Sequence, residues 1–190
     1  MRDLSAWVRA RTGVSESAVS ESAVSERGAP DAAASRESLR DLAVLYAMAV
    51  DAHDLDALAV MFHPDMVLER DGETASGRDA VLELLAASMR GFRRMLHTPE
   101  THVVHVDGQK GEGIATAHAE LVTGRGVVLA AHEYEDAYVV HDGRWVFASR
   151  RIRFVYAARS DRYGEILPAD DRVQLPGDEP RAMLGSWFTG

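Results

Sequence analysis

Three polar residues, Tyr46, Asp51 and His97, have types and positions that could support acid–base chemistry. Tyr46 lies on the apolar stripe of a predicted helix, Asp51 lies near its end, and His97 precedes Pro99 and a predicted strand. A buried carboxylate is costly unless it is paired, and it can hold a histidine in one tautomer and stabilise its protonated form. The functional hypothesis is that Asp51 orients a histidine and that Tyr46 acts as a proton donor.

Each of these residues also has a structural interpretation. Asp51 could cap the chain as a helix-end carboxylate near His53 and Asp54. Tyr46 could be a core tyrosine whose hydroxyl is satisfied at the edge of the core. A lone histidine such as His97 is more often structural than catalytic. Helical spacing alone leaves both interpretations open for all three residues.

A later strand adds a candidate pocket wall. His132, Tyr134 and Asp136 alternate with Glu133 and Glu135, so the two sets lie on opposite faces. The glutamate face is expected to be solvated, which turns the polar and aromatic face inward, as in the wall of a binding pocket. The alternative is an aromatic ladder beneath the helices, with Asp136 paired to an arginine.

The following strand carries a run of arginines. Arg150, Arg151 and Arg153 present guanidinium groups to both faces, and one of them could anchor a carbonyl, carboxylate or oxyanion of a ligand. The alternative is a solvated edge with one internal ion pair. His118, on an earlier strand, is expected to face away from the pocket, toward solvent or a subunit interface.

The histidines do not have metal-ligand spacing. His102 and His105 fall on opposite faces of a predicted strand, and His53 and His63 lie on either side of a helix break. No His-Glu-x-x-His or glycine-rich nucleotide motif occurs. The sequence therefore predicts neither a metal nor another cofactor.

Bulk properties exclude several classes of protein. The chain has 190 residues, 46% of them apolar, which fits one domain with a core. Its 30 acidic and 21 basic residues give a net charge of -9, which disfavours nucleic acid and anionic membranes as partners. There is no cysteine, no apolar run long enough to span a bilayer and no secretory signal pattern. We therefore expect a cytoplasmic protein.

The order of the predicted elements indicates an α+β fold. Residues 1–34 contain a short Val-Ser-Glu-Ser-Ala repeat and are predicted to form a mobile tail, with a short helix around residues 4–8 as an alternative. Residues 35–158 are predicted to form the domain, and residues 159–190 an extension that covers the pocket, contacts a partner subunit or is disordered. Ser35 is the expected N-cap of the first helix. Helices are expected over 35–53, 54–62 and 79–92, and strands over 66–69, 101–106, 114–122, 127–140 and 145–156. Helices packed across a curved antiparallel sheet would enclose one pocket.

Several segments, taken in order, resemble the SnoaL-like superfamily of nuclear-transport-factor-2-like proteins. They are Tyr46-Ala-Met-Ala-Val-Asp51, Asp54-Leu-Asp-Ala-Leu58, Met61-Phe62-His-Pro-Asp65, Gly77-Arg-Asp-Ala-Val81, His97, His102, Val106-Asp-Gly108 and Asp142-Gly-Arg-Trp-Val-Phe147. The resemblance covers about residues 35–156. It implies a cone-shaped α+β barrel and a homodimer or higher homo-oligomer.

Within this superfamily the pattern looks most like the scytalone dehydratase and bile-acid dehydratase type. That resemblance implies His97 as general base and acid, Asp51 as its orienting partner and Tyr46 as a proton donor. The candidate substrate-binding residues are Arg150, Tyr134, His132, His102, Phe62 and Asp136. The sequence departs from scytalone dehydratase at His132 and Tyr134, which implies a different substrate.

Three functions remain as hypotheses. The first is a cofactor-free dehydratase or isomerase acting on a small carbonyl compound of polyketide, aromatic or steroid type. The second is a polyketide cyclase, or an epoxide hydrolase using Asp136 and Arg150. The third is a non-catalytic binding protein, which predicts that Asp51 and His97 lie apart or that side chains fill the cavity.

Overall fold

The chain folds into four helices packed on a strongly curved six-stranded sheet, in a computed structural model that describes residues 3–14, 31–175, 177 and 179–182. The strand order is β2-β1-β6-β5-β4-β3; β1 pairs with β6 in parallel, and every other neighbouring pair is antiparallel. The strands are β1 (Phe62–Arg70), β2 (Glu73–Ser76), β3 (Arg94–Asp107), β4 (Lys110–Thr123), β5 (Gly126–His141) and β6 (Arg144–Arg159). The α+β class predicted from the sequence is confirmed.

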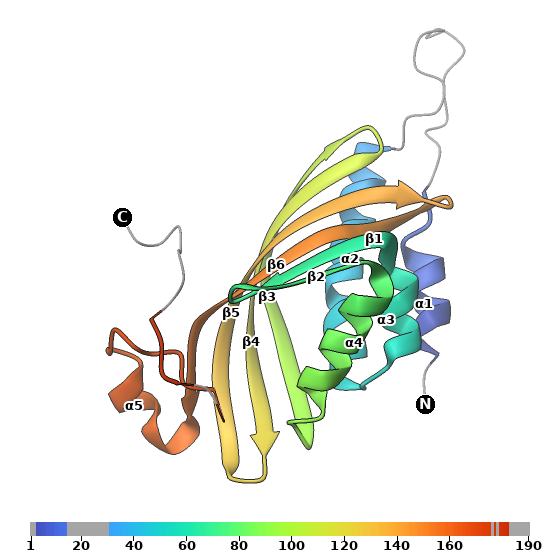
Figure 1. The fold of residues 1–190 in the computed structure, drawn as a ribbon. Helices are drawn as coiled ribbons and strands as arrows, with labels where there is room; N and C mark the ends of the chain where they lie inside the picture. The colour runs from blue at the N-terminus through green and yellow to red at the C-terminus, as the bar shows by residue number, and fades with distance from the viewer. Residues whose placement is uncertain (1–2, 15–30, 176, 178, 183–190) are drawn as a thin grey trace, which may run out of the picture.

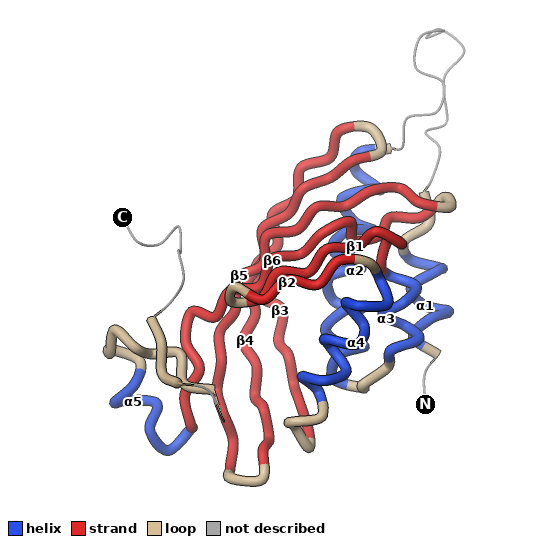
Figure 2. The backbone as a smooth tube through the Cα atoms, viewed as in Figure 1, coloured by secondary structure: helices blue, strands red, loops and turns tan. Residues whose placement is uncertain are grey.

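The helices gather against one face of this sheet (Figures 1 and 2). They are α1 (Leu4–Arg11), α2 (Ala32–Asp51), α3 (Leu55–Met61) and α4 (Arg78–Met89). A short turn η1 (Ser160–Arg162) and α5 (Tyr163–Ile166) follow β6 and lie away from the other helices. The core between helices and sheet includes the fully buried Leu39, Leu58, Met66, Trp145 and Phe147.

Helix α2 positions the first candidate residues. Its buried residues Leu39, Leu42, Tyr46 and Ala49 recur at helical spacing, as predicted. The helix begins earlier than expected, because Asp31 accepts hydrogen bonds from the first-turn amides and caps the helix, whereas the predicted N-cap Ser35 is buried inside it.

A second apolar stripe on this helix, beside the first, is only partly buried. Val44 is 46% exposed and Met48 is 39% exposed, so the helix is not buried around its whole circumference. The sheet covers one side of α2, and α1 and α3 cover only part of the other.

The N-terminal segment differs from the predicted mobile tail. Residues 4–11 form α1, which packs on α2 and α3 with Leu4 and Val8 buried. The amide of Val14 donates to the carbonyl of Gly143, which anchors the end of this segment to the β5–β6 turn. The repeat over residues 15–30 lies outside the described residues, as do Trp187 and Phe188.

The strand containing His97 begins earlier than predicted. Strand β3 pairs with β4 from Arg94 onward, and an irregularity between Pro99 and His102 absorbs the proline. Proline is tolerated there because β3 is an edge strand. His97 therefore lies within a strand, opposite Ala119, with a fixed orientation toward the end of α2.

Candidate active site

His97 and Asp51 form the pair that the sequence suggested. The Nδ1 atom of His97 lies 2.6 Å from Oδ1 of Asp51, and the backbone N–H of His97 donates to Oδ2 of the same carboxylate at 2.9 Å. Asp54, not Asp51, caps the following helix α3 by accepting from the amide of Ala57. The capping interpretation of Asp51 is therefore replaced by a carboxylate held against the histidine.

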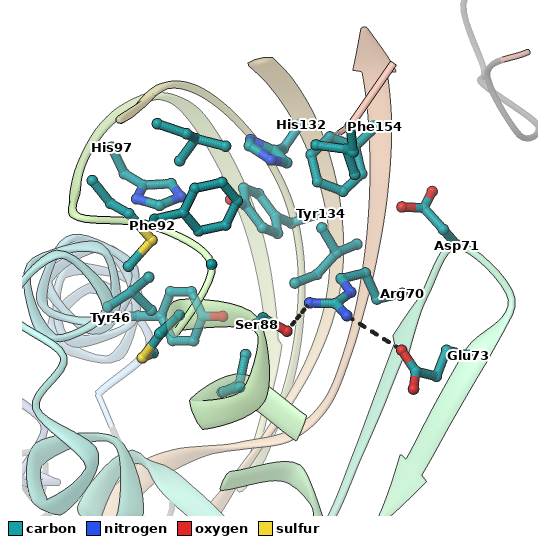
Figure 3. Close-up of a pocket in the computed structure, with 18 of the residues that line it drawn as sticks. Tyr46, Arg70, Asp71, Glu73, Ser88, Phe92, His97, His132, Tyr134 and Phe154 are labelled. Atoms are coloured by element: carbon teal, nitrogen blue, oxygen red, sulfur yellow. Dashed lines mark hydrogen bonds and ion pairs between the residues drawn. The ribbon is translucent and has the colours of Figure 1, made fainter. Parts of the chain in front are cut away.

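This geometry fixes the proton on one nitrogen of His97. A carboxylate can only accept hydrogen bonds, so Nδ1 of His97 carries the hydrogen and Nε2 has a free lone pair. No group among the described residues hydrogen-bonds to Nε2, and the His97 ring borders the cavity (Figure 3). The side chain can therefore accept a proton from a molecule bound there.

The cavity beside His97 has a volume of about 440 Å³, which is in the range of small-molecule sites. Apolar side chains form much of its wall, and polar groups are gathered at a few points of the lining (Figure 3). The apolar lining residues are Val50, Leu85, Met89, Phe92, Met95, Leu121, Ile152, Phe154 and Leu175. Such a cavity suits a mainly apolar ligand with a small number of polar atoms.

Tyr46 also lines the cavity and is 6% exposed. The guanidinium carbon of Arg150 lies 4.1 Å from the centre of its ring. Burial raises the pKa of Tyr46, although Arg150 opposes this shift. The phenol therefore keeps its proton near neutral pH and can donate a hydrogen bond or a proton.

His132 and Tyr134 of β5 form part of the cavity wall, as the pocket interpretation predicted. Burial lowers the pKa of His132 to about 3, and the neighbouring His97 acts in the same direction. Burial raises the pKa of Tyr134 above its ordinary value. Both side chains are thus uncharged near neutral pH, in a wall that carries polar atoms without charge.

Further along β5, the aromatic-ladder interpretation describes the structure better. Asp136 accepts two hydrogen bonds from Arg150, both at 2.7 Å, and a third from Tyr138 at 2.8 Å. Asp136 does not border the main cavity. Arg150 borders an adjoining recess of about 20 Å³, room for about one water molecule. Arg150 and Asp136 also border a second hollow of about 640 Å³, which His97 and Tyr46 do not line.

Two other predicted ligand-binding residues also lie away from the main cavity. Phe62 is 2% exposed and packs against Tyr46 and Phe147 in the core. His102 lies 3.0 Å from the hydroxyl of Tyr138, on the far side of the buried Asp136–Arg150 pair. None of the four predicted ligand-binding residues Phe62, His102, Asp136 and Arg150 lines the main cavity. Core packing and a buried hydrogen-bonded network account for their positions.

One outer-face expectation was also wrong. Glu133 is 2% exposed, although the alternation placed it on a solvated face. It lies opposite Arg153 in the β5–β6 register, beside Glu135, which pairs with Arg151 and Arg153. The glutamates of β5 and the arginines of β6 thus lie beside one another, and together they cover part of this face of the sheet. His118 does face away from the cavity, is half-exposed and pairs with Glu100 at 2.8 Å.

Sequence reasoning missed the polar residues on the β1–β2 side of the cavity. These are Arg70, Asp71, Glu73, Ser88 and Arg181. A signal for Arg70 was available, because Met66 and Leu68 are buried and strand alternation places Arg70 on the same face. The predicted strand ended one residue too early to include it.

No helix within the described residues is long and apolar enough to cross a membrane. No three histidine or acidic side chains within the described ranges cluster as a metal site would require.

The chain belongs to the SnoaL-like domain family, whose match covers residues 31–151. No curated protein matches it significantly. Solved structures share the fold: a hexachlorocyclohexane dehydrochlorinase of the LinA type from Novosphingobium barchaimii is 23% identical, with a TM-score of 0.62, covering 66% of this chain and 90% of that one.

Two further solved structures extend the comparison. A candidate scytalone dehydratase from Novosphingobium aromaticivorans is 19% identical with a TM-score of 0.60, and 74% of this chain and 92% of that one are covered. A protein of unknown function from Mycobacterium tuberculosis is 28% identical with a TM-score of 0.57, and the coverage is 62% and 70%. The shared fold thus hosts lyases and proteins without known activity, and activity must be argued from the site.

Proposed function

We propose that the protein is a lyase or isomerase that removes an acidic C–H proton from a small carbonyl compound, with His97 as base. The observation that carries this proposal is the 2.6 Å contact between His97 and Asp51 beside a cavity of about 440 Å³. A binding protein would have no need to hold a basic nitrogen toward its ligand. LinA-type dehydrochlorinases and a candidate scytalone dehydratase share the fold, which is compatible with elimination chemistry.

The reaction follows from the positions of the side chains. Nε2 of His97 takes the proton next to the carbonyl, and the C–H electron pair forms an enolate. Asp51 stabilises the imidazolium, and the phenol of Tyr46 donates a hydrogen bond to the enolate oxygen. The enolate then expels a β-hydroxyl, which takes a proton from His97 and leaves as water, giving an enone. Return of the proton to another carbon would instead give isomerisation.

Among the alternative enzymes, epoxide hydrolysis has lost its support. Asp136 and Arg150 are bonded to each other and are almost fully buried outside the main cavity. Neither is free to activate water or bind an epoxide oxygen there. Cyclisation of a polyketide-like substrate would use the same His97 and Tyr46, and remains a second use of this site.

The test measures proton abstraction directly, because the leaving group is unknown. The probe is 2-tetralone in D2O, and NMR follows deuterium incorporation next to the carbonyl. We expect the wild-type protein to accelerate exchange, His97→Ala to abolish the acceleration, and Asp51→Asn to reduce it about 10²-fold or more, because the tautomer is no longer fixed.

Matched controls are available on the surface. His105→Ala changes an exposed histidine of the outer sheet face, and Asp65→Asn changes a side chain that is 91% exposed. Both should exchange protons like the wild type. Exchange by His97→Ala at the wild-type rate would remove His97 as the base and the proposal with it.

A further inference from the structure

Arg70 is the arginine bordering the cavity whose charge is least compensated. The other arginine of the lining, Arg181, contacts Asp71 at 2.9 Å, and that carboxylate is 11% exposed. Within the described residues, Arg70 forms an ion pair only with Glu73, at 3.2 Å, and acts on Asp71 at longer range. The Glu73 side chain is 59% exposed, so water screens this pair and it contributes little.

The guanidinium of Arg70 is nevertheless held in place. The Ser88 hydroxyl donates its hydrogen to the carbonyl of Leu84 at 2.8 Å, so its oxygen must act as acceptor for Arg70, 2.5 Å away. Helix α4 therefore orients the arginine through a neutral group. The other N–H groups of Arg70 have no hydrogen-bond partner within the described ranges.

The position of Arg70 relative to His97 defines two ends of the site. Arg70 is in β1 and His97 is in β3, with β6, β5 and β4 between them in the curved sheet. Figure 3 shows Arg70 across the cavity from His97, on the side of Asp71 and Glu73. The space between them is bordered by apolar side chains such as Leu85, Met89 and Ile152.

We propose that Arg70 binds a carboxylate of the substrate, so that the substrates of this site are carboxylic acids whose apolar body extends toward His97. This inference rests on the proposed function and names its substrate class. A guanidinium matches a carboxylate in charge and in the geometry of its paired donors. The substrate carboxylate replaces the exposed Glu73 as the partner of Arg70, and the reacting C–H lies near Nε2 of His97.

The test compares two probes of the same shape, 2-naphthylacetate and its uncharged analogue 2-naphthylacetamide, by isothermal titration calorimetry. We expect the wild type to bind the carboxylate more tightly than the amide. Arg70→Met should weaken carboxylate binding about tenfold or more and leave amide binding nearly unchanged. Ser88→Ala should weaken it less, because only the orientation of Arg70 is lost.

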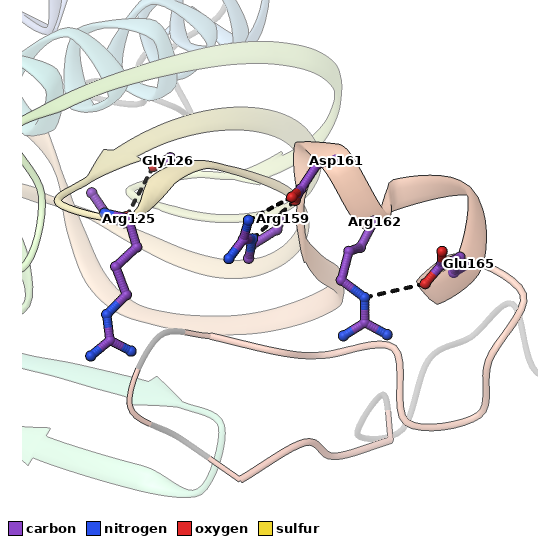
Figure 4. Close-up of polar contacts among 7 residues, drawn as sticks. Arg125, Gly126, Arg159, Asp161, Arg162 and Glu165 are labelled. Atoms are coloured by element: carbon purple, nitrogen blue, oxygen red, sulfur yellow. Dashed lines mark hydrogen bonds and ion pairs between the residues drawn. The ribbon is translucent and has the colours of Figure 1, made fainter.

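Glu73→Gln should change carboxylate binding in the direction opposite to Arg70→Met, and it removes only an exposed charge. It should tighten carboxylate binding by about two- to fivefold, because the competing carboxylate is gone. If Arg70→Met does not fold, this variant decides the matter: unchanged or weaker binding overturns the proposal. Arg125→Met is the matched control, since Arg125 extends into solvent from the β4–β5 turn (Figure 4).

His97→Ala separates this inference from the proposed function. Loss of proton exchange with the carboxylate preference intact supports both, and wild-type exchange with the preference intact rejects only the catalytic proposal. Equal binding of the two probes by the wild type overturns the Arg70 assignment. So does a preference that survives Arg70→Met but disappears in His97→Ala, because the carboxylate would then lie at the histidine.

Discussion

At the scale of the residue, burial sets which side chains of the cavity carry protons. Burial lowers the pKa of His132 to about 3 and raises the pKa of Tyr46, so both are neutral around pH 7. His97 differs from them because its Nδ1 contacts a carboxylate, which favours an imidazolium once Nε2 has taken a proton. The site thus holds one histidine suited to proton transfer and another that contributes polarity without charge.

The depressed pKa of His132 predicts a pH dependence of stability. In the unfolded chain this histidine binds a proton below about pH 6.5, whereas in the folded chain it stays neutral down to about pH 3. The unfolded state binds more protons in this window, so the free energy of unfolding falls as the pH is lowered, by about 1.4 kcal/mol per pH unit well below 6.5. His132→Gln should show a shallower fall in urea unfolding at a series of pH values.

The comparison uses the difference between the two proteins, because other groups titrate in both. His105→Gln serves as control, since His105 is exposed and is not among the groups that shift the pKa of His132. Its pH profile should follow the wild type. Parallel profiles for wild type and His132→Gln between about pH 6.5 and pH 3 would contradict the assignment of a neutral, buried His132.

At the scale of the element, the Asp136–Arg150 pair fastens β5 to β6. The two residues face each other in the register, and the Tyr138 hydroxyl also donates to Asp136. Arg150 in turn lies against the rings of Tyr46, Tyr134 and Phe147. The pair therefore sets the positions of a cavity tyrosine on α2 and another on β5.

Breaking this pair should be strongly destabilising. Asp136→Asn leaves the Arg150 charge buried without its counter-charge, and a cost of about 3–5 kcal/mol in the free energy of unfolding is expected from urea titration. Asp161→Asn, which breaks the exposed Arg159–Asp161 pair (Figure 4), should leave the unfolding midpoint unchanged. Equal losses of stability in Asp136→Asn and Asp161→Asn would mean that the contribution of the Asp136–Arg150 pair does not depend on its burial.

The sequence predicted element types better than element limits. Apolar periodicity and turn signals found α2, α3, α4 and every strand except the short β2 in the correct order, because those patterns arise within each segment. The early starts of β1 and β3 depend on pairing with β6 and β4, which a single segment does not encode. Helix α1 was foreseen only as an alternative, a short helix around residues 4–8 within a mobile tail, because its short apolar face becomes significant only against α2 and α3.

The sequence also predicted some residues of the candidate site and not others. His97, Asp51 and Tyr46 were found from residue type and resemblance, and His132 and Tyr134 from strand alternation. Spacing could not show that Asp136 and Arg150 satisfy each other, since that depends on the β5–β6 register. Arg70 and Arg181 were missed because they come from distant segments that meet only in the folded chain.

At the scale of the whole molecule, the segment after α5 returns to the cavity. Residues 172–174 hydrogen-bond to Ala157 at the end of β6, and Val173 pairs with Arg181. Leu175 and Arg181 then border the cavity, where the pocket-cover alternative for the C-terminal extension places them. The Arg181–Asp71 contact joins this strap, residues 172–175 and 179–181, to the β1–β2 turn.

The strap should slow the exit of a bound ligand. Arg181→Gln removes the contact that joins the strap to the β1–β2 turn, so dissociation of 2-naphthylacetate should become about three- to tenfold faster in stopped-flow displacement. Asp71→Asn should have a similar effect. Because the two side chains act through one contact, the double variant should be no faster than either single variant.

Arg162→Gln is the matched control, because Arg162 pairs with Glu165 on the exposed turn leading into α5, away from the cavity (Figure 4). Its dissociation rate should equal that of the wild type. If the effects of Arg181→Gln and Asp71→Asn multiply in the double variant, the residues act independently and the strap is not held by their contact. An unchanged rate in Arg181→Gln would mean that the ligand leaves by a route that the strap does not cover.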